Sequence, residues 1–221
     1  MSERFGMAKV PDRGNSSSFE AQLRTRLADL DVDLPEDLWA LVSWLEEHGQ
    51  HFSYTRTHEP FLSTSMVKTH DALWSSIGFE MPQDFIRHWI GKPGFEREII
   101  PLVRCGGDGS YFALWMQGND SVRYIFLGSE GEAFVVAEDT RNFIALLAMG
   151  YCSVEGRFSL ELQPHVEWDA MFDTDWPKPD QLSQWVEDRF DLTLPAKGSD
   201  LLPTYAKGDP FEAFLEKACD F

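Results

Sequence analysis

The sequence predicts an α+β fold in which helices pack on an antiparallel sheet of about four to six strands. Short β-type segments fill the stretch from Ile99 to Ala137, and Gly-rich turns divide them. Amphipathic helical patterns come before and after this stretch. The chain has 221 residues, of which 43% are hydrophobic and 14% aromatic, so it can bury a sizeable core.

Helix signals dominate the first part of the chain. Residues 1–17 are polar and predict a flexible N-terminal tail. The capping box Ser17-x-x-Glu20 then predicts a short helix with leucines at helical spacing. A second helix is expected with Pro35 at its first position and Gly49 as its C-cap.

A third helix follows a stretch without a regular pattern. Residues 50–66 have no clean period and predict a loop. Met81–Asp84 (MPQD) has the chemistry of a helix start, and Gly91 and Pro93 predict the end of that helix.

The central stretch alternates between strands and turns. Gly106–Gly109 (GGDG) and Gly128–Gly131 (GSEG) are typical of turns between strands. Asp139 or Thr140 is expected to cap a helix that ends at Gly150. The four predicted strands are Ile99–Arg104, Tyr111–Met116, Val122–Leu127 and Ala133–Ala137.

The last part of the chain is less regular and predicts a helical extension that packs on the preceding module. Residues 157–163 are compatible with one more strand, and helices are expected after Pro179 and from Pro210. The predicted organisation is a tail (1–17), an α+β module (18–151) and a C-terminal extension (152–221).

The chain is strongly acidic, with 19 Lys+Arg, 37 Asp+Glu and a formal net charge of −18. Residues 161–221 hold 5 basic and 14 acidic side chains, which is half of the excess. Because binding to nucleic acid needs a basic footprint, this charge argues against nucleic acid and acidic membranes as partners. It favours a basic protein partner, and it is equally compatible with a role in solubility alone.

The cysteines and the N-terminus favour a cytoplasmic protein. Cys105, Cys152 and Cys219 are too few and too scattered for a disulfide framework, so reduced thiols are expected. The N-terminus has no apolar core of a secretory signal, and no apolar run reaches the length of a membrane span.

Two features of the central stretch are compatible with chemistry, but structural explanations are favoured. Gly106–Gly109 is a candidate anion nest, and the favoured alternative is a tight hairpin turn that needs a positive φ. Cys105 follows Arg104 and is a candidate nucleophile, and the favoured alternative is a half-buried structural cysteine.

Metal binding is not favoured either. His48-x-x-His51 has a ligand-like spacing, with His58 and His70 nearby, but zinc needs further ligands at good geometry. Residues 173–180 are acidic, but they lack the Gly and the terminal Glu of a calcium loop. The sequence therefore predicts no catalytic residue, no metal and no cofactor.

The order of these motifs resembles the SUKH superfamily, which includes bacterial toxin-immunity proteins and fungal cell-wall-assembly regulators. The resemblance covers residues 34–151. It rests on a leading helix, on MPQDF at 81–85, on IPL at 100–102 with GGDG and YFAL after it, and on the helix at 140–147 with Phe143, Ile144 and Leu147.

The resemblance implies a SUKH-like α+β binding protein without enzymatic activity. Bacterial members act as antidotes that bind a toxin and block its active site or substrate groove. The alternative is a regulatory scaffold that binds a cellular enzyme or peptide, as the fungal relatives do. A hydrolase built around Cys105 is a third class and the least favoured.

An acidic face that mimics nucleic acid would suit the basic groove of a toxin. Two Trp residues are candidate anchors, because Trp is enriched at binding hot spots: one ends a strand beyond the GGDG turn, and the other lies in an acidic loop. The expected state is a monomer or a weak homodimer. The candidate partner-binding residues are Asp108, Trp115, Asp173, Asp175, Trp176 and Asp180.

Overall fold

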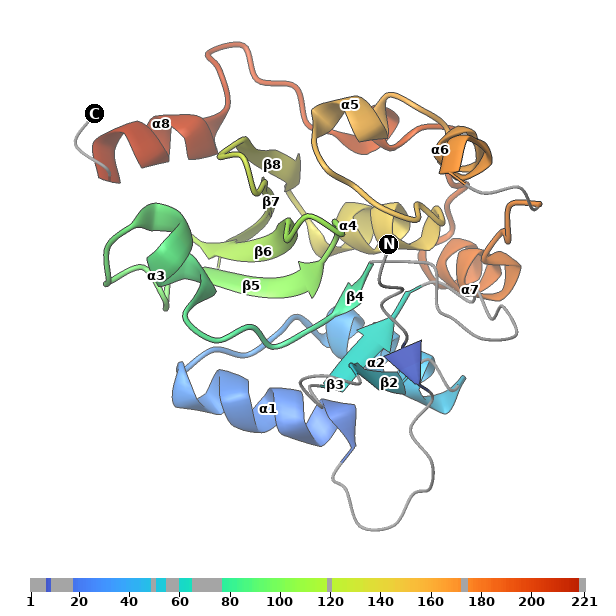
Figure 1. Ribbon diagram of the computed structural model, residues 1–221, viewed down its shortest axis with the longest axis horizontal. Helices are drawn as coiled ribbons and strands as arrows, with labels where there is room; N and C mark the ends of the chain where they lie inside the picture. Colours follow the sequence, from blue (N-terminus) through green and yellow to red (C-terminus); the bar gives the residue numbers. More distant parts are fainter. Residues whose placement is uncertain are drawn as a thin grey trace, which may run out of the picture.

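A computed structural model describes residues 7–8, 18–48, 51–54, 60–64, 77–118, 121–171 and 175–218 (Figure 1). Their strands form one sheet whose order, β1 to β8, follows the sequence, and every neighbouring pair is antiparallel. Helices cover both faces of its central part. The predicted α+β fold with an antiparallel sheet is therefore confirmed.

The elements have the following bounds. The strands are β1 (Met7–Ala8), β2 (His51–Tyr54), β3 (Pro60–Ser63), β4 (Gly78–Phe79), β5 (Ile99–Arg104), β6 (Tyr111–Met116), β7 (Val122–Leu127) and β8 (Ala133–Ala137). The helices are α1 (Phe19–Asp29), α2 (Glu36–Glu47), α3 (Phe85–Ile90), α4 (Thr140–Ala148), α5 (Arg157–Leu160), α6 (Pro164–Met171), α7 (Asp180–Phe190) and α8 (Pro210–Ala218), with a 3₁₀ turn η1 (Gly198–Leu201).

The central strands β5–β8 coincide with the four predicted strands. Strands β6 and β7 pair without interruption from Tyr111 opposite Leu127 to Met116 opposite Val122. The register of β5 on β6 shifts between Pro101 and Val103. Proline has no backbone N–H to donate to the ladder, so such an irregularity is expected next to it.

Alternation along β5–β8 divides their side chains between two cores. Phe112, Phe126 and Phe134 point into the larger core, whereas Ile125 and Val135 belong to a second core on the opposite face. Both faces are covered, so these strands are continuous hydrophobic runs without the polar alternation of a half-exposed sheet.

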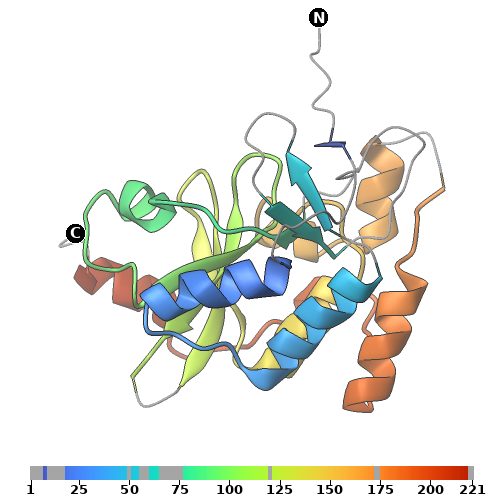
Figure 2. The ribbon, with the colours of Figure 1, turned by 90° about the horizontal axis from the view of Figure 1, so that it is seen from below.

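The larger core lies between the sheet and a row of helices. Helices α1, α2, α4 and α7 lie side by side in Figure 2, and the contacts run from α1 to α2, from α2 to α4 and from α4 to α7. Aromatic contacts fix α4 on the sheet, because Phe143 stacks on Tyr124 with 4.2 Å between ring centroids and meets Phe112 edge to face at 5.8 Å.

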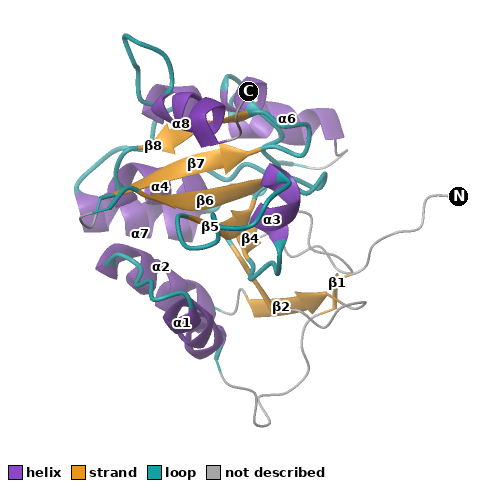
Figure 3. Ribbon diagram, turned by 90° about the vertical axis from the view of Figure 1, so that its left-hand side faces the viewer, coloured by secondary structure: helices purple, strands orange, loops and turns teal. Residues whose placement is uncertain are grey.

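The second core lies under α3 and α8, on the other side of β5–β8 from α4 and α7 (Figure 3). Phe211 of α8 is fully buried there and packs on Trp115 of β6, with 5.0 Å between ring centroids. The Asp209 carboxylate accepts a hydrogen bond from the Val135 N–H at 2.9 Å. This contact occupies a backbone donor of β8, the last strand of the sheet.

The residues after 151 pack on both sides of the module. Helix α7 contacts α4, where the Ser183 hydroxyl donates to the Ala148 carbonyl at 3.0 Å, and α8 contacts β8. The sheet and its helical layers are therefore completed by the C-terminal part of the chain.

Several local predictions need correction. The predicted loop at 50–66 contains β2 and β3, and the predicted tail at 1–17 contains β1, which pairs with β2. Phe61 and Leu62 of β3 are both fully buried, so a strand this short shows no alternation that a sequence pattern can detect.

The predicted strand at 157–163 was also wrong, because this segment contains the short helix α5. Its alternating Phe158, Leu160 and Leu162 imitate a strand, but only Leu160 is buried. The Tyr151 hydroxyl bonds the Leu160 and Leu162 carbonyls at 3.4 and 2.7 Å, which fixes a helical turn instead.

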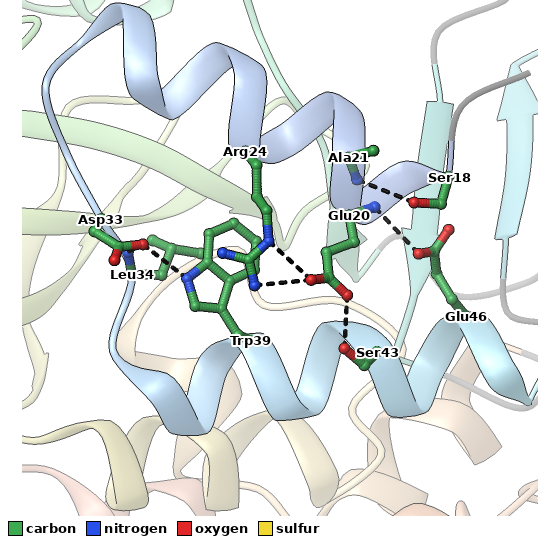
Figure 4. A network of polar contacts seen from close by, with 9 residues as sticks. All are labelled: Ser18, Glu20, Ala21, Arg24, Asp33, Leu34, Trp39, Ser43 and Glu46. Atoms are coloured by element: carbon green, nitrogen blue, oxygen red, sulfur yellow. Dashed lines mark hydrogen bonds and ion pairs between the residues drawn. The ribbon is translucent and has the colours of Figure 1, made fainter.

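The start of α1 differs in detail from the predicted capping box. Ser18, and not Ser17, is the N-cap, and its hydroxyl accepts from the Ala21 N–H at 3.1 Å. The Phe19 N–H donates to the Glu46 carboxylate of α2 at 2.6 Å, and the Glu20 N–H donates to the same carboxylate at 3.1 Å. Figure 4 shows the second of these bonds. A neighbouring helix therefore supplies the acidic partner that the capping box assigned to Glu20.

Glu20 is instead part of a polar network between α1 and α2 (Figure 4). Its carboxylate accepts from the Ser43 hydroxyl at 2.6 Å and from Arg24 at 2.8 Å. The hydrogen bond from Ser43 is the main cause that lowers the pKa of Glu20; burial opposes it and Arg24 adds to it. The Arg24 guanidinium also lies 3.7 Å from the ring centroid of Trp39, which bonds Asp33 through its indole N–H.

The other predicted helix ends agree with the structure to within one residue. Pro35 is the N-cap of α2 and not its first helical residue. Asp139, one of the two expected caps, accepts from the Asn142 N–H at 2.8 Å and begins α4. Gly91 ends α3 with a φ of 81°. The predicted C-cap Gly49 lies outside the described residues.

Candidate partner-binding surface

Asp108 lies in the turn between β5 and β6 and ties it to the turn between β7 and β8. One carboxylate oxygen accepts from the Ser110 N–H at 3.0 Å, and the other accepts from the hydroxyls of Ser110 and Ser129 at 2.8 and 2.6 Å. Burial raises the pKa of Asp108, but these hydrogen bonds outweigh it and lower the pKa overall. Asp108 is therefore an ionised, solvent-exposed side chain that also has a structural role.

The GGDG turn has the geometry of the tight hairpin. Gly109 has a φ of 100°, and a Cβ at Gly106 would collide with the Asp108 carboxylate. The Asp108 carboxylate accepts from the Ser110 N–H, and the Gly109 N–H donates within the turn to Gly106. The turn therefore already contains its own anion at a position that a bound anion would need, which favours the hairpin explanation over the anion nest.

Cys105 precedes this turn and is fully buried rather than half-buried as expected. Burial raises the pKa of its thiol well above the ordinary value; the Asp108 charge raises it further, and the Arg104 charge lowers it. A nucleophilic cysteine needs an accessible thiolate. The geometry therefore favours a structural cysteine at this position.

Trp115 needs correction as a candidate anchor. Its side chain is 4% exposed, because Phe211 and Phe214 of α8 cover it at ring-centroid distances of 5.0 and 5.3 Å. The sequence pattern placed Trp115 at a strand end, but gave no sign that the last helix would fold over that end. Trp115 belongs to the second core, so it cannot contact a partner while α8 is in place.

Trp176 lies in the segment that leads into α7, between exposed acidic residues. Its ring is half-buried against Cys152 and Trp168, and its indole N–H donates to the Gly150 carbonyl at 3.2 Å. Asp175 and Asp180 are both exposed, and Asp180 forms a 3.4 Å ion pair with Lys178.

The structure therefore brings three of the six predicted residues together: Asp175, Trp176 and Asp180. Asp108 belongs to the hairpin turns and Trp115 to the opposite side of the sheet, whereas Asp173 lies outside the described residues.

A groove of about 260 Å³ adjoins Trp176. It lies between the start of α6, helix α7 and the segment 194–196, and it is large enough for one or two side chains of a partner. Its wall is mixed, because His165, Lys178 and Glu187 are polar and the proline and alanine of 194–196 are not. We call this groove, with Asp175, Trp176 and Asp180, the α6–α7 surface.

The candidate surface also includes residues that the predictions missed. Phe158 of α5, Leu162 in the bend after α5, and Val166 of α6 are large hydrophobic side chains that are exposed. They occur at intervals of four residues, which is close to the helical period, and that spacing was the available signal. The expected strand at 157–163 concealed it.

The described residues contain no group of three or more His, Cys, Asp or Glu that could hold a metal ion. Within the predicted His cluster, the His48 ring stacks on Trp44 with 3.8 Å between centroids. The Nδ1 atom of His48 forms a hydrogen bond with the backbone carbonyl of Trp44. The side chains of the other three, His51, His58 and His70, lie outside the description. No helix among the described residues is long and apolar enough to cross a membrane.

Comparisons with protein-family models, with curated proteins and with solved structures return no match. The resemblance to the SUKH superfamily therefore stays a prediction, and the function is argued from the surface itself.

Proposed function

We propose that this chain is a non-enzymatic binding protein, and that it acts as an immunity protein of the SUKH type, which neutralises a cognate bacterial toxin by covering its active site or substrate groove. The observation that carries the proposal is the α6–α7 surface, where exposed carboxylates flank a half-buried Trp beside a groove. Such a surface suits a basic protein that itself binds an anionic substrate.

Charge makes this surface suited to a basic partner. Asp175 and Asp180 are exposed, and the one cation between them, Lys178, pairs with Asp180. Complementary charge at the rim of an interface accelerates encounter and orients the partner, whereas the central contacts set the residence time. The half-buried Trp176 is the aromatic side chain best placed for such a central contact.

The motifs that resemble the SUKH superfamily support the proposal through their arrangement. The MPQDF segment precedes and begins α3, the GGDG turn joins β5 to β6, and the helix with Phe143 and Ile144 is α4, packed on the sheet. The proposal requires that the elements carrying these motifs have the order and packing expected of the superfamily. A fold by itself does not define a function, so the test has to be functional.

The first test is affinity capture of the tagged full chain from its native cells, followed by a growth assay with the captured protein. We expect one stoichiometric basic partner that arrests growth when it is expressed alone and is harmless when this chain is co-expressed. A partner whose expression never affects growth would contradict the immunity function.

Charge reversal then tests the α6–α7 surface. The double variant Asp175→Lys and Asp180→Lys should weaken binding to the captured partner by about tenfold or more at low salt, with a reduced salt dependence. The matched control reverses two exposed acids on other helices, Asp29→Lys on α1 and Glu216→Lys on α8. Figure 1 shows both helices on the other side of the view from α6 and α7. Equal effects of both pairs would show that overall charge, and not this surface, governs binding.

The groove also supports the alternative, a regulatory scaffold that binds a cellular enzyme or a peptide. A volume of about 260 Å³ accommodates side chains of an extended peptide as readily as those of a folded toxin. Capture of several housekeeping proteins, without a partner that arrests growth, would favour this alternative.

A further inference from the structure

Phe158, Leu162 and Val166 are exposed hydrophobic side chains within nine consecutive residues, and we call this set the α5–α6 patch. Their exposed fractions are 63%, 41% and 41%. Within the part of the chain that the structure describes, no other large hydrophobic side chain is exposed, and all three lie within residues 158–166. Exposed apolar side chains that occur singly need no explanation, but a cluster indicates an interaction site.

The backbone that carries the patch is fixed from within. The Leu162 N–H donates to the Ser159 carbonyl at 3.3 Å, and the Leu162 carbonyl accepts from the Tyr151 hydroxyl at 2.7 Å. Leu160 and Trp168 of the same segment are buried and attach it to the rest of the molecule. The buried residues Leu160 and Trp168 therefore hold this segment in the fold, and we expect folding not to depend on the three exposed side chains.

Acidic residues occur before, within and after the patch along the chain. Glu155, Glu161 and Asp169 are exposed beside it. The one arginine of the segment, Arg157, directs its guanidinium at the ring of Phe134, 4.2 Å from the centroid, and so contributes to the internal packing. A partner that buries the patch therefore meets carboxylates at its rim.

The segment that carries the patch also contributes to the α6–α7 surface. Residues 163–165 line the groove, and they connect Leu162 to Val166 along the chain. A partner segment that lies over the patch can therefore extend a side chain into the groove, next to Trp176.

We propose that the α5–α6 patch is the hydrophobic anchor for a basic amphipathic segment of a partner protein, which places apolar side chains on Phe158, Leu162 and Val166 and lysine or arginine side chains on the neighbouring carboxylates. The inference rests on the proposed function, because it assigns the partner's contact within that binding role. Apolar burial provides the affinity, and the acidic rim selects a basic segment over a neutral one.

The test uses the full chain and two synthetic peptides of about four helical turns. One carries leucines on one face and lysines on the other; in the second, serines replace the leucines. Fluorescence anisotropy should show that the chain binds the leucine peptide about tenfold or more tightly than the serine peptide. The triple variant Phe158→Ser, Leu162→Ser, Val166→Ser should lose this preference but keep weak binding of both peptides through charge.

A control variant, Ala28→Ser with Ala213→Ser, places serines at exposed positions on α1 and α8 and should retain the preference. Unchanged thermal melting would show that the triple variant is folded. Equal binding of the two peptides by the original chain, or an unaltered preference in the triple variant, would overturn the inference. So would a homodimer in sedimentation experiments that the triple variant abolishes, because the occupant would then be a second copy.

The two proposals fail separately. A captured partner that never arrests growth would overturn the immunity function, and the leucine-peptide preference would still stand. A toxin whose binding is unaffected by the triple variant would overturn the patch as its anchor, and the immunity function would still stand.

Discussion

Asp108 shows how one side chain joins two turns that are distant in the sequence. Its carboxylate accepts from Ser110 in its own turn and from Ser129 in the turn between β7 and β8. Both hydroxyls donate to an ionised acceptor, and hydrogen bonds to a charged group are stronger than those between neutral groups. Because the carboxylate is exposed, solvent screens part of this gain, and we assign about 1 kcal/mol to it.

The variant Asp108→Asn should therefore lose about 1 kcal/mol of the free energy of unfolding at neutral pH. Folding lowers the pKa of Asp108 below its ordinary value of 3.8, so the stabilisation is complete above that value and disappears as the pH falls through the folded-state pKa. The difference from the original chain should thus shrink in acid. Urea denaturation at several pH values measures it, with the exposed Asp29→Asn as the control. A difference that does not change with pH would contradict this account.

Which side chains would be exposed was harder to predict than which elements would form. Asp175 and Asp180 are exposed, as expected of charged residues in an acidic loop, but Trp115 is buried. The burial of Trp115 depends on α8, which lies far away in the sequence. A local pattern carries no information on such a contact, so the sequence could suggest aromatic candidates but could not select among them.

At the scale of elements, α1 and α2 stabilise each other through complementary helix ends. Two Glu residues, Glu46 and Glu47, end α2, where the helix dipole disfavours negative charge. Glu46 finds its compensation in the N-terminus of α1, because it accepts from the Phe19 and Glu20 N–H groups. Glu47 is exposed.

The single variants Glu46→Ala and Glu47→Ala test whether only Glu46 stabilises the start of α1. Glu46→Ala leaves two N–H groups of α1 without their acceptor and should cost about 1–2 kcal/mol. Glu47→Ala should change stability by less than about 0.5 kcal/mol, since it removes only an exposed charge. Urea denaturation measures both. Equal effects would mean that Glu46 does not cap α1.

Helix α8 gives a second prediction for an element. Phe211→Ala removes a fully buried ring from the second core and should cost about 3–5 kcal/mol. Phe158→Ala removes a ring that is 63% exposed and should cost less than about 0.5 kcal/mol, although it should weaken partner binding. Thermal and urea denaturation compare the two. A large loss of stability in Phe158→Ala would show that the α5–α6 patch is needed for folding.

Longer elements with clear residue signals at their ends were easier to predict from the sequence than short ones. Strands β5–β8 and helices α3, α4, α7 and α8 were predicted because long hydrophobic runs, glycines and prolines mark them. Strands β2–β4 have only two to four residues, which is too short for a detectable pattern, and β2 and β4 also pair with the distant strands β1 and β5. The segment 157–163 misled because alternation in a short run fits a strand or a helix.

For the whole molecule, the net charge of −18 opposes folding through self-repulsion. The structure compensates this only locally. Among the described residues the ion pairs are Arg24–Glu20, Arg104–Glu80, Arg123–Glu138, Lys178–Asp180 and Arg189–Asp37. Four of them are at least a quarter exposed on both partners, and exposed pairs contribute little.

Repulsion among the excess carboxylates acts over longer distances than the attraction within these ion pairs. Salt should therefore weaken the repulsion more than it weakens the attraction. The Debye length falls from about 30 Å at 0.01 M salt to about 8 Å at 0.15 M. The melting temperature at neutral pH should therefore rise over this range of NaCl, and calorimetry measures the change. KCl should act like NaCl, because the effect is screening and not specific binding of an ion. A melting temperature that falls with salt would show that the ion pairs outweigh the repulsion, and the acidic surface would then be balanced within the fold without a basic partner.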